Sequence, residues 1–294
     1  MLDLKSNKYL SKDELREIAP SIFSTKPSPE VSKHYSHIPT DKLIDDMKLL
    51  GWNVIDAKEV SARQKSTIGY QKHLVVFRND DIVINQMPNN IRESITSPTG
   101  YRRTDGTFAK KNPIDTVFPQ ILLTNSHDGK NSFTFTAGLY RMICENGLVI
   151  ADSKFEDFKI RHMGYDFETL QETIKGMVEK LPLTVESMNK MKSTELKASQ
   201  AIQLAKDLLD LRIENTENKY DDEAVEEVLT PQREEDSGFG LWEVFNRIQE
   251  NIIEGNFSYI QKSGKTRQAR IIKNFKQDQV LNKDMFSKAL EYVA

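Results

Sequence analysis

Short runs of alternating apolar and polar residues in the first half of the chain predict a β-sheet. These runs are rich in β-branched and aromatic residues and lie at Asn53–Val60, Tyr70–Arg78, Val117–Thr124, Phe133–Ile143 and Phe155–His162. An alternation of period two puts every second side chain on the same face of a strand. Because a parallel crossover needs a dozen or more residues, the connection lengths favour an antiparallel meander.

The second half of the chain changes to the three-and-four spacing of an α-helix. Apolar residues follow this spacing from Asp166 to about Ile213, and Pro182 is expected to kink or split the helix. A helix of this length would overhang a small sheet and would therefore pack on another helix or another subunit. A separate amphipathic helix is predicted at Leu241–Ile253, closed by Gly255.

Two shorter helices are predicted before the sheet. Lys12–Ile18 is amphipathic within a stretch rich in Ser, Pro and Lys, which indicates an arm that contains one helix. After Thr40 or Asp41, either of which can cap a helix, apolar residues recur at helical spacing until Gly51.

Together these patterns predict an α+β protein, with an antiparallel β-meander core followed by long helices and a small C-terminal helical unit. In chain order we expect an N-terminal arm at 1–39, a sheet core at 40–165, a long helical segment at 166–213, an acidic linker at 214–237 and a C-terminal helical unit with a basic segment at 238–294. The linker assignment depends on charge. From residue 214 to residue 236, ten Asp or Glu stand against one Lys and one Arg, which is typical of a solvated loop.

Composition narrows the class of protein. The 294 residues are 38% hydrophobic and include 14 Phe and 9 Tyr, so a sizeable core can form and wholesale disorder is excluded. Cys144 is the single cysteine, which excludes an internal disulfide and a cysteine-rich zinc module. The chain has no run of about 18 apolar residues, and its N-terminus lacks the apolar core of a secretion signal. We therefore expect a location in the cytoplasm, away from membranes.

The formal net charge of −3 conceals two cationic stretches. Between Lys262 and Lys288, eight Lys or Arg stand against two Asp, and the candidate binding residues there are Lys265, Arg267 and Arg270. The other stretch lies in the unpatterned loop from Asn89 to Pro113. Its candidate residues are Tyr101, Arg102, Arg103, Phe108, Lys110 and Lys111.

Both stretches combine cations with aromatic residues. For the C-terminal stretch these are Phe257 and Tyr259, which come just before Lys262. Cations bind phosphates, and aromatic rings stack on unpaired bases with a gain of roughly 1–3 kcal/mol per base. The pattern therefore indicates nucleic-acid binding that follows the backbone with little sequence selectivity. The alternative is a pair of solvated loops that balance acidic surface elsewhere, and the occurrence of both stretches in one chain favours binding.

Catalytic signals are weak. Ser126, His127 and Asp128 are triad-type residues, but adjacent residues in a turn cannot face one another as a relay requires, so a turn is the favoured interpretation. Cys144 and His127 could form a thiolate–imidazole pair on neighbouring strands, although an isolated cysteine is more often buried in the core. The five His are scattered, and no phosphate-binding loop or dinucleotide motif is present. We expect no enzyme activity, no metal and no cofactor.

Several blocks of sequence resemble a known family. The most specific are the SHDG turn with His127 and Asp128, the block that holds Arg141 and Asn146, and the Arg–His pair that ends at His162. They resemble the phage- and plasmid-borne family catalogued as domain of unknown function 932, over about 260 residues to the C-terminus. This resemblance implies a mobile-element accessory protein. Such proteins have been suggested to be remotely similar to Rad52-like single-strand annealing proteins, which form oligomers on DNA without hydrolysing ATP.

The sequence thus leads to one hypothesis and two rivals. The hypothesis is a non-enzymatic phage or prophage protein that binds nucleic acid, with single-stranded DNA as the expected form, as a homo-oligomer. One rival is an inhibitor that binds a host antiviral-defence protein, and the other is an enzyme that uses Cys144 or His127. The residues expected to fix the sheet turns or to line the binding groove are His127, Asp128, Arg141, Asn146 and His162.

Overall fold

The computed structural model describes residues 9–62, 64–79, 81–82, 117–131, 133–141, 158–160, 166–213 and 217–293. These residues form two compact units. The sheet unit holds the described residues up to 181, and the helical unit holds those from 182 onward. The boundary falls within helix α4 (Phe167–Lys192), which supplies residues to both units. In the described part of the chain, no helix is both long and apolar enough to cross a membrane.

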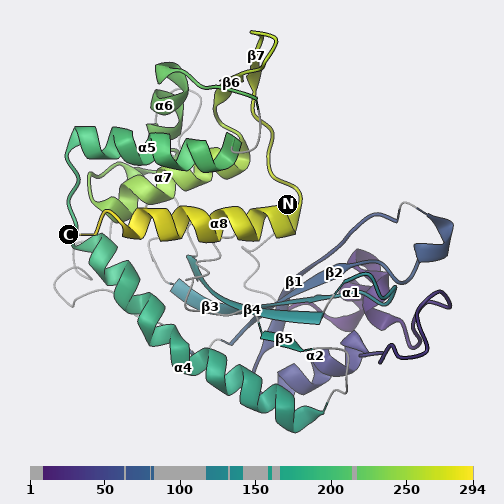
Figure 1. The fold of residues 1–294 in the computed structure, drawn as a ribbon. Helices are drawn as coiled ribbons and strands as arrows, with labels where there is room; N and C mark the ends of the chain where they lie inside the picture. Colours follow the sequence, from purple (N-terminus) through teal and green to yellow (C-terminus); the bar gives the residue numbers. More distant parts are fainter. Residues whose placement is uncertain are drawn as a thin grey trace. The chain divides into compact units, whose positions relative to one another are not determined.

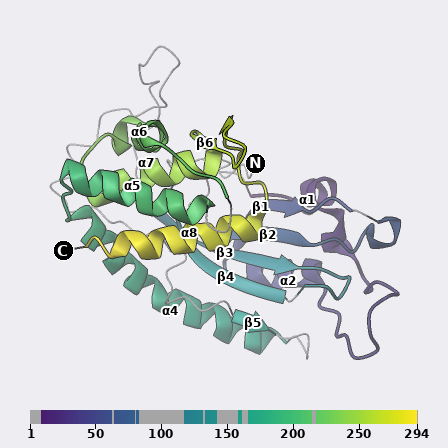
Figure 2. The ribbon, with the colours of Figure 1, turned by 45° about the horizontal axis from the view of Figure 1, so that its top comes forward.

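The sheet unit is built on an antiparallel meander of five strands in chain order (Figure 1). The strands are β1 (Asn53–Glu59), β2 (His73–Arg78), β3 (Val117–Asn125), β4 (Phe133–Arg141) and β5 (Phe158–Ile160). Strands β1 to β4 can be followed side by side in Figure 2. All six residues of β2 are buried, which shows that both faces of this interior strand are covered. With the helices below, this confirms the predicted α+β fold.

The sheet unit also contains short helices. They are α1 (Lys12–Ile18), η1 (Pro20–Phe23), α2 (Thr40–Leu49) and η2 (Lys65–Thr67). Helices α1 and α2 pack against β1. Ser11 caps α1 in a reciprocal capping box with Glu14. Thr40 is not the cap of α2, because it is the first helical residue and Pro39 occupies the cap position.

The predicted N-terminal arm is packed in its described part. Leu15, Ile22 and Ile38 have no exposed surface, and the amide of Leu10 donates to the carbonyl of Val54 in β1. These contacts make the stretch part of the core of the sheet unit. The sequence did not predict this, because Ser, Pro and Lys dominate the composition there and only a few apolar residues anchor it.

The helical unit surrounds one buried helix. Its other elements are α5 (Ala198–Ile213), α6 (Asp222–Leu229), η3 (Glu234–Asp236), β6 (Ser258–Ile260), β7 (Thr266–Gln268) and α8 (Phe275–Leu290). The buried helix is α7 (Leu241–Glu254), which packs against α5, α6 and α8. Gly255 ends it in the left-handed conformation, with φ 79°, as the sequence predicts.

Two predictions for this half of the chain were wrong. Helix α4 runs through Pro182 without a break. The long helical segment divides at 193–197 instead, where the amide of Leu196 donates to the carbonyl of Phe239. The acidic stretch is not a solvated linker either. It contains α6 and η3, and Ala224, Val225 and Val228 bury one face of α6, while the acidic side chains occupy the other face.

Candidate nucleic-acid interface

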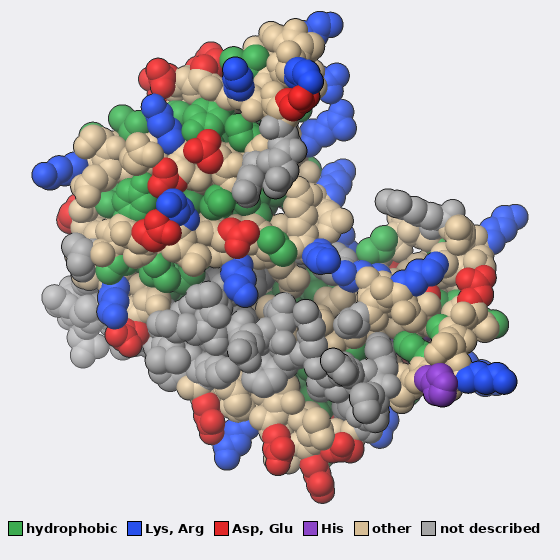
Figure 3. Space-filling model, viewed as in Figure 1, with side chains coloured by type: hydrophobic (Ala, Val, Ile, Leu, Met, Phe, Trp, Pro, Cys, Tyr) green, Lys and Arg blue, Asp and Glu red, His purple; other side chains and the backbone are tan. Residues whose placement is uncertain are grey.

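An exposed basic hairpin is formed by β6 and β7. Tyr259 in β6 is directly opposite Arg267 in β7, which puts both side chains on one face. Gly264 makes the turn between the strands with φ 78°. Figure 3 shows Lys and Arg side chains projecting from the part of the helical unit that holds this hairpin, and Lys262 and Lys265 belong to its tip.

The hairpin is fixed to its surroundings on both sides. Lys219 and Ile260 exchange backbone hydrogen bonds of 2.8 and 2.7 Å, which extends the hairpin by one bridge. On the other side, the Gln268 side-chain amide donates to the carbonyls of Gly255 and Phe257 at 2.6 and 3.1 Å. The position of the hairpin relative to α7 is therefore determined by hydrogen bonds.

A pocket of about 350 Å³ opens beside this hairpin. The residues that line it include Arg212 at the end of α5, Tyr259, Arg267 and Arg270, and no Asp or Glu is among the lining residues that the structure describes. Arg212 Nη2 donates to the carbonyl of Arg270 at 3.1 Å. Burial lowers the pKa of the Arg212 guanidinium, and nearby Tyr259 opposes this shift. The pocket therefore gathers three arginines with Tyr259, and buried Phe257 is also among its lining residues.

Neutralisation of this surface is limited among the described residues. Lys262 pairs with Glu217, an ion pair between two exposed side chains. Lys265, Arg267 and Arg270 are exposed and form no ion pair with a carboxylate in the described ranges. Three of the cations proposed from sequence thus lie together and remain available to a ligand.

The structure alters the aromatic part of the sequence prediction. Phe257 is only 1% exposed, so it cannot stack on a base. Tyr259 is partly exposed and lines the pocket. Arg212 was missed, because it belongs to α5 and is far along the chain from the basic stretch, with no local signal beside it in the sequence.

Most of the remaining candidates cannot be compared with the structure. Outside the described residues lie Tyr101, Arg102, Arg103, Phe108, Lys110, Lys111, Cys144, Asn146 and His162. Arg141 is the last residue of β4, opposite Val117, but its side chain is also outside the described set.

The SHDG turn is structural in its described contacts. Asp128 accepts hydrogen bonds from Ser126 Oγ at 2.8 Å and from the amide of Lys130 at 3.1 Å. His127 is fully buried, and its ring lies 4.7 Å from His37 and 5.2 Å from His73 between centroids. Because a sealed imidazole cannot reach a ligand at the surface, His127 does not line a groove, and its predicted role in fixing the turn is the one that its contacts support.

His73 is the centre of a buried polar network in the sheet unit. Its Nδ1 lies 3.0 Å from Ser21 Oγ, its Nε2 lies 2.9 Å from Thr40 Oγ1, and Ser21 in turn donates to Glu59. Burial lowers the pKa of His73 to about 4, opposed by its contact with the Gln71 carbonyl. Ser21 and His73 have no exposed surface, so this Ser–His–Glu set cannot act on a substrate. Among the described residues, no group of His, Cys, Asp or Glu is arranged to hold a metal ion.

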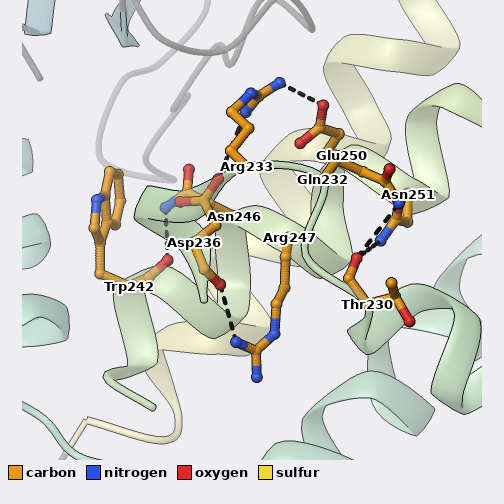
Figure 4. Close-up of polar contacts among 9 residues, drawn as sticks. All are labelled: Thr230, Gln232, Arg233, Asp236, Trp242, Asn246, Arg247, Glu250 and Asn251. Carbon is orange, nitrogen blue, oxygen red and sulfur yellow. Dashed lines mark hydrogen bonds and ion pairs between the residues drawn. The ribbon is translucent and has the colours of Figure 1, made fainter. Parts of the chain in front are cut away.

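A second buried polar cluster lies along α7 (Figure 4). Arg233 pairs with Glu250 and lies 3.6 Å from Asp236, while Arg247 Nη1 donates to the Asp236 carbonyl at 2.9 Å. Asn251 Nδ2 donates to the Thr230 carbonyl at 2.8 Å. These bonds hold residues 230–238 on the polar side of α7, which explains why a helix with an amphipathic sequence is buried on all sides.

The fold and the site define an α+β protein with a central antiparallel meander, a helical unit and a basic hairpin. Comparison of the sequence with protein-family models matches residues 29–286 to the family described as Domain of unknown function (DUF932). The chain belongs to this family, as its sequence blocks predict.

Two curated relatives come from Escherichia coli (strain K12). They are the UPF0380 proteins YafZ and YfjQ, and each is 26% identical over 286 residues, covering 96% of this chain and 91% of the relative. No solved structure gives a significant match. The suggested similarity to Rad52-like annealing proteins therefore gains no support from these comparisons.

Proposed function

We propose that this protein binds nucleic acid, with single-stranded DNA as the preferred form, through the β6–β7 hairpin and the pocket beside it. The observation that carries the proposal is the gathering of Arg212, Arg267 and Arg270 with Tyr259 around a pocket whose described lining residues include no carboxylate. Guanidinium groups bind phosphate oxygens through paired N–H donors, and this contact does not depend on base sequence.

The preference for single strands follows from Tyr259. A tyrosine ring can stack only on a base whose face is open, and the bases of a duplex are covered by their neighbours. A two-stranded β-ribbon can also enter a groove of duplex DNA, so the ring of Tyr259, and not the hairpin as such, is the feature that supports binding along an unpaired strand.

The net charge of the chain does not oppose this proposal. Acidic side chains are concentrated on α6, where Asp222, Glu223 and Glu226 are exposed, whereas the cations are concentrated on the hairpin. At physiological ionic strength the Debye length is about 8 Å, so carboxylates farther than this from the hairpin are largely screened, whereas Glu227 of α6, which accepts from the Ser258 amide, is close to it. Binding as an oligomer, in a phage or prophage setting, is kept in the proposal as an expectation from the sequence resemblance alone. It includes no catalytic step.

Fluorescence anisotropy with a labelled single-stranded oligonucleotide tests the proposal. We expect binding at low salt that weakens as salt rises, with a slope of log K against log salt that becomes about 0.7 less steep for each phosphate contact removed. The double variant R267Q/R270Q should lower both the affinity and the slope. The matched control, K190Q/K197Q, removes two cations from another part of the helical unit and should bind as the wild type does.

Two results would overturn the proposal. One is no binding of the wild-type protein at low salt, and the other is an equal effect of the two double variants. In either case the protein-binding alternative takes its place, and capture of a host defence protein becomes the relevant assay.

A further inference from the structure

We propose that the pocket formed by Arg212, Tyr259 and Arg270 is a subsite for a single nucleotide unit, in which the arginines bind the phosphate and Tyr259 stacks on the base. This inference rests on the proposed function, because it identifies the part of a nucleic acid that the protein holds most specifically. It separates the pocket from the hairpin tip, where Lys262 and Lys265 provide charge alone.

Arg212 is the reason for expecting an anion inside the pocket. Its Nε atom is sealed from solvent and has no hydrogen-bond partner among the described residues, while its Nη2 is used by the Arg270 carbonyl. A cation that has lost water is destabilising unless an anion or a set of acceptors replaces that water. Among the described residues that line the pocket there is no Asp or Glu, so a ligand is the source of negative charge that the proposal assigns to this site.

The chemistry of the pocket favours a phosphate over a carboxylate. A terminal phosphate offers three unesterified oxygens, and an internal one offers two, to the forks of several arginines, and such bidentate contacts are the strong ones. A carboxylate would be satisfied by one fork and would leave the others unpaired.

Tyr259 adds a requirement for an aromatic group next to the anion. Its register opposite Arg267 places a ring and a guanidinium on the same face of the hairpin, where a base and its own phosphate could be bound together. The pocket volume of about 350 Å³ lies at the small end of the range for ligand sites, which is roughly 300–1,000 Å³. One nucleotide, rather than a folded nucleic acid, is the ligand of matching size.

The walls of this subsite are held in place before any ligand arrives. Gly255 approaches the chain so closely that a Cβ atom there would lie 2.8 Å from backbone atoms of Ala269 and Arg270. The amide of Ile272 donates to the Ile253 carbonyl at 2.9 Å, which secures the far side of Arg270. A rigid scaffold of this kind reduces the ordering cost of binding.

Competition experiments on the full-length protein test the subsite. Thymidine 5′-monophosphate, thymidine and inorganic phosphate are each titrated against the protein with a bound labelled oligonucleotide, and direct binding of the three is followed by calorimetry. We expect the monophosphate to bind saturably and compete, and both thymidine and inorganic phosphate to bind at least about tenfold more weakly, since a charge-assisted bond or a base stack is missing. Oligonucleotides with and without a 5′-phosphate distinguish a terminal phosphate from an internal one, and both results are consistent with a nucleotide subsite.

Variants connect this result to the named residues. Arg212→Gln should weaken binding of the monophosphate by roughly tenfold or more, and Arg212→Lys should give an intermediate loss, because it keeps the charge and removes the fork. Tyr259→Ala should weaken the monophosphate and leave inorganic phosphate unchanged. Lys197→Gln is the control for loss of one exposed cation, and Arg212→Lys also keeps the test valid if Arg212→Gln fails to fold.

The outcomes separate this inference from the proposed function. If the oligonucleotide binds with salt dependence, but the monophosphate does not compete and Arg212→Gln matches Lys197→Gln, the subsite is overturned and the proposed function stands. If inorganic phosphate binds as tightly as the monophosphate, the nucleotide assignment is also overturned. If the oligonucleotide fails to bind, but the monophosphate binds and Arg212→Gln abolishes this, the pocket is a nucleotide site and the proposed function is wrong.

Discussion

Arg233, in the segment after α6, forms a buried ion pair with Glu250 on α7. The same guanidinium lies 3.6 Å from the buried carboxylate of Asp236. One buried cation is therefore shared by two carboxylates from different elements. The segment after α6 is attached to the central helix of its unit by charge as well as by hydrogen bonds.

Removing one partner of this pair should be strongly destabilising. We expect Glu250→Gln to lower the free energy of unfolding by about 1.5–3 kcal/mol, because the buried guanidinium would lose one charged partner and keep Asp236 as the other. Urea unfolding followed by circular dichroism measures this change. Glu226→Gln, at an exposed position on α6, is the control and should change the value by less than about 0.5 kcal/mol. Similar losses for the two variants would contradict a buried ion pair.

The two glycines of the hairpin region provide a matched pair of substitutions. Gly255 and Gly264 have nearly the same φ, 79° and 78°, so alanine is strained at both positions by about 1 kcal/mol. A Cβ at Gly255 would also meet the backbone of Ala269 and Arg270 at 2.8 Å, whereas nothing lies within 4 Å of a Cβ at Gly264. We therefore expect Gly255→Ala to lower the thermal midpoint clearly more than Gly264→Ala. Equal shifts would show that the close approach has no energetic consequence.

Local patterns were sufficient to predict the sheet. Helix α1 has the predicted bounds, and β3 and β4 differ from theirs by one or two residues at one end, because strand alternation and caps are encoded within a few neighbouring positions. Helix α6 was missed although its signal was present, since Ala224, Val225 and Val228 form a short apolar stripe that the surrounding acidic residues obscured. The break predicted at Pro182 was wrong for another reason. A proline inside a helix costs about 3 kcal/mol, and burial of other residues of the helix, such as Met177 and Met188, can offset that loss.

The candidate site could be predicted only in part. Arg267 and Arg270 were identified because they are close in sequence, whereas Arg212 joins them only through tertiary packing. The same limit applies to His127, whose burial beside His37 and His73 depends on three distant segments. Local sequence identifies residue types, and the fold decides which of them meet and which remain exposed.

The stability of the sheet unit should depend on pH through His73. Its pKa of about 4 in the folded protein lies below the ordinary value of 6.5, so the unfolded chain binds more protons between these values. The free energy of unfolding therefore falls as the pH falls from 6.5 to 4, by up to about 3 kcal/mol at 1.36 kcal/mol per unit. His73→Gln should lower stability most near neutral pH, and its difference from the wild type should shrink in acid. His34→Gln, at an exposed position, should show no such change, and a constant difference for His73→Gln across this range would refute the prediction.

Asn251 should contribute as much to the helical unit as a buried apolar residue. Its Nδ2 donates to the carbonyls of Val228 and Thr230 at 3.0 and 2.8 Å, and its Oδ1 accepts from Gln232 at 3.1 Å. Asn251→Ala would remove the buried contact to the Val228 carbonyl and the part-buried contacts to Thr230 and Gln232, at about 1–3 kcal/mol for each group that stays unsatisfied. We expect a loss of stability of that size or larger, with faster amide exchange in α6, because the end of that helix is attached through these carbonyls. Asn189→Ala, at an exposed position of α4, is the control and should leave both stability and exchange in α6 unchanged. Unaltered exchange in the Asn251 variant would mean that α6 is held by its apolar face alone.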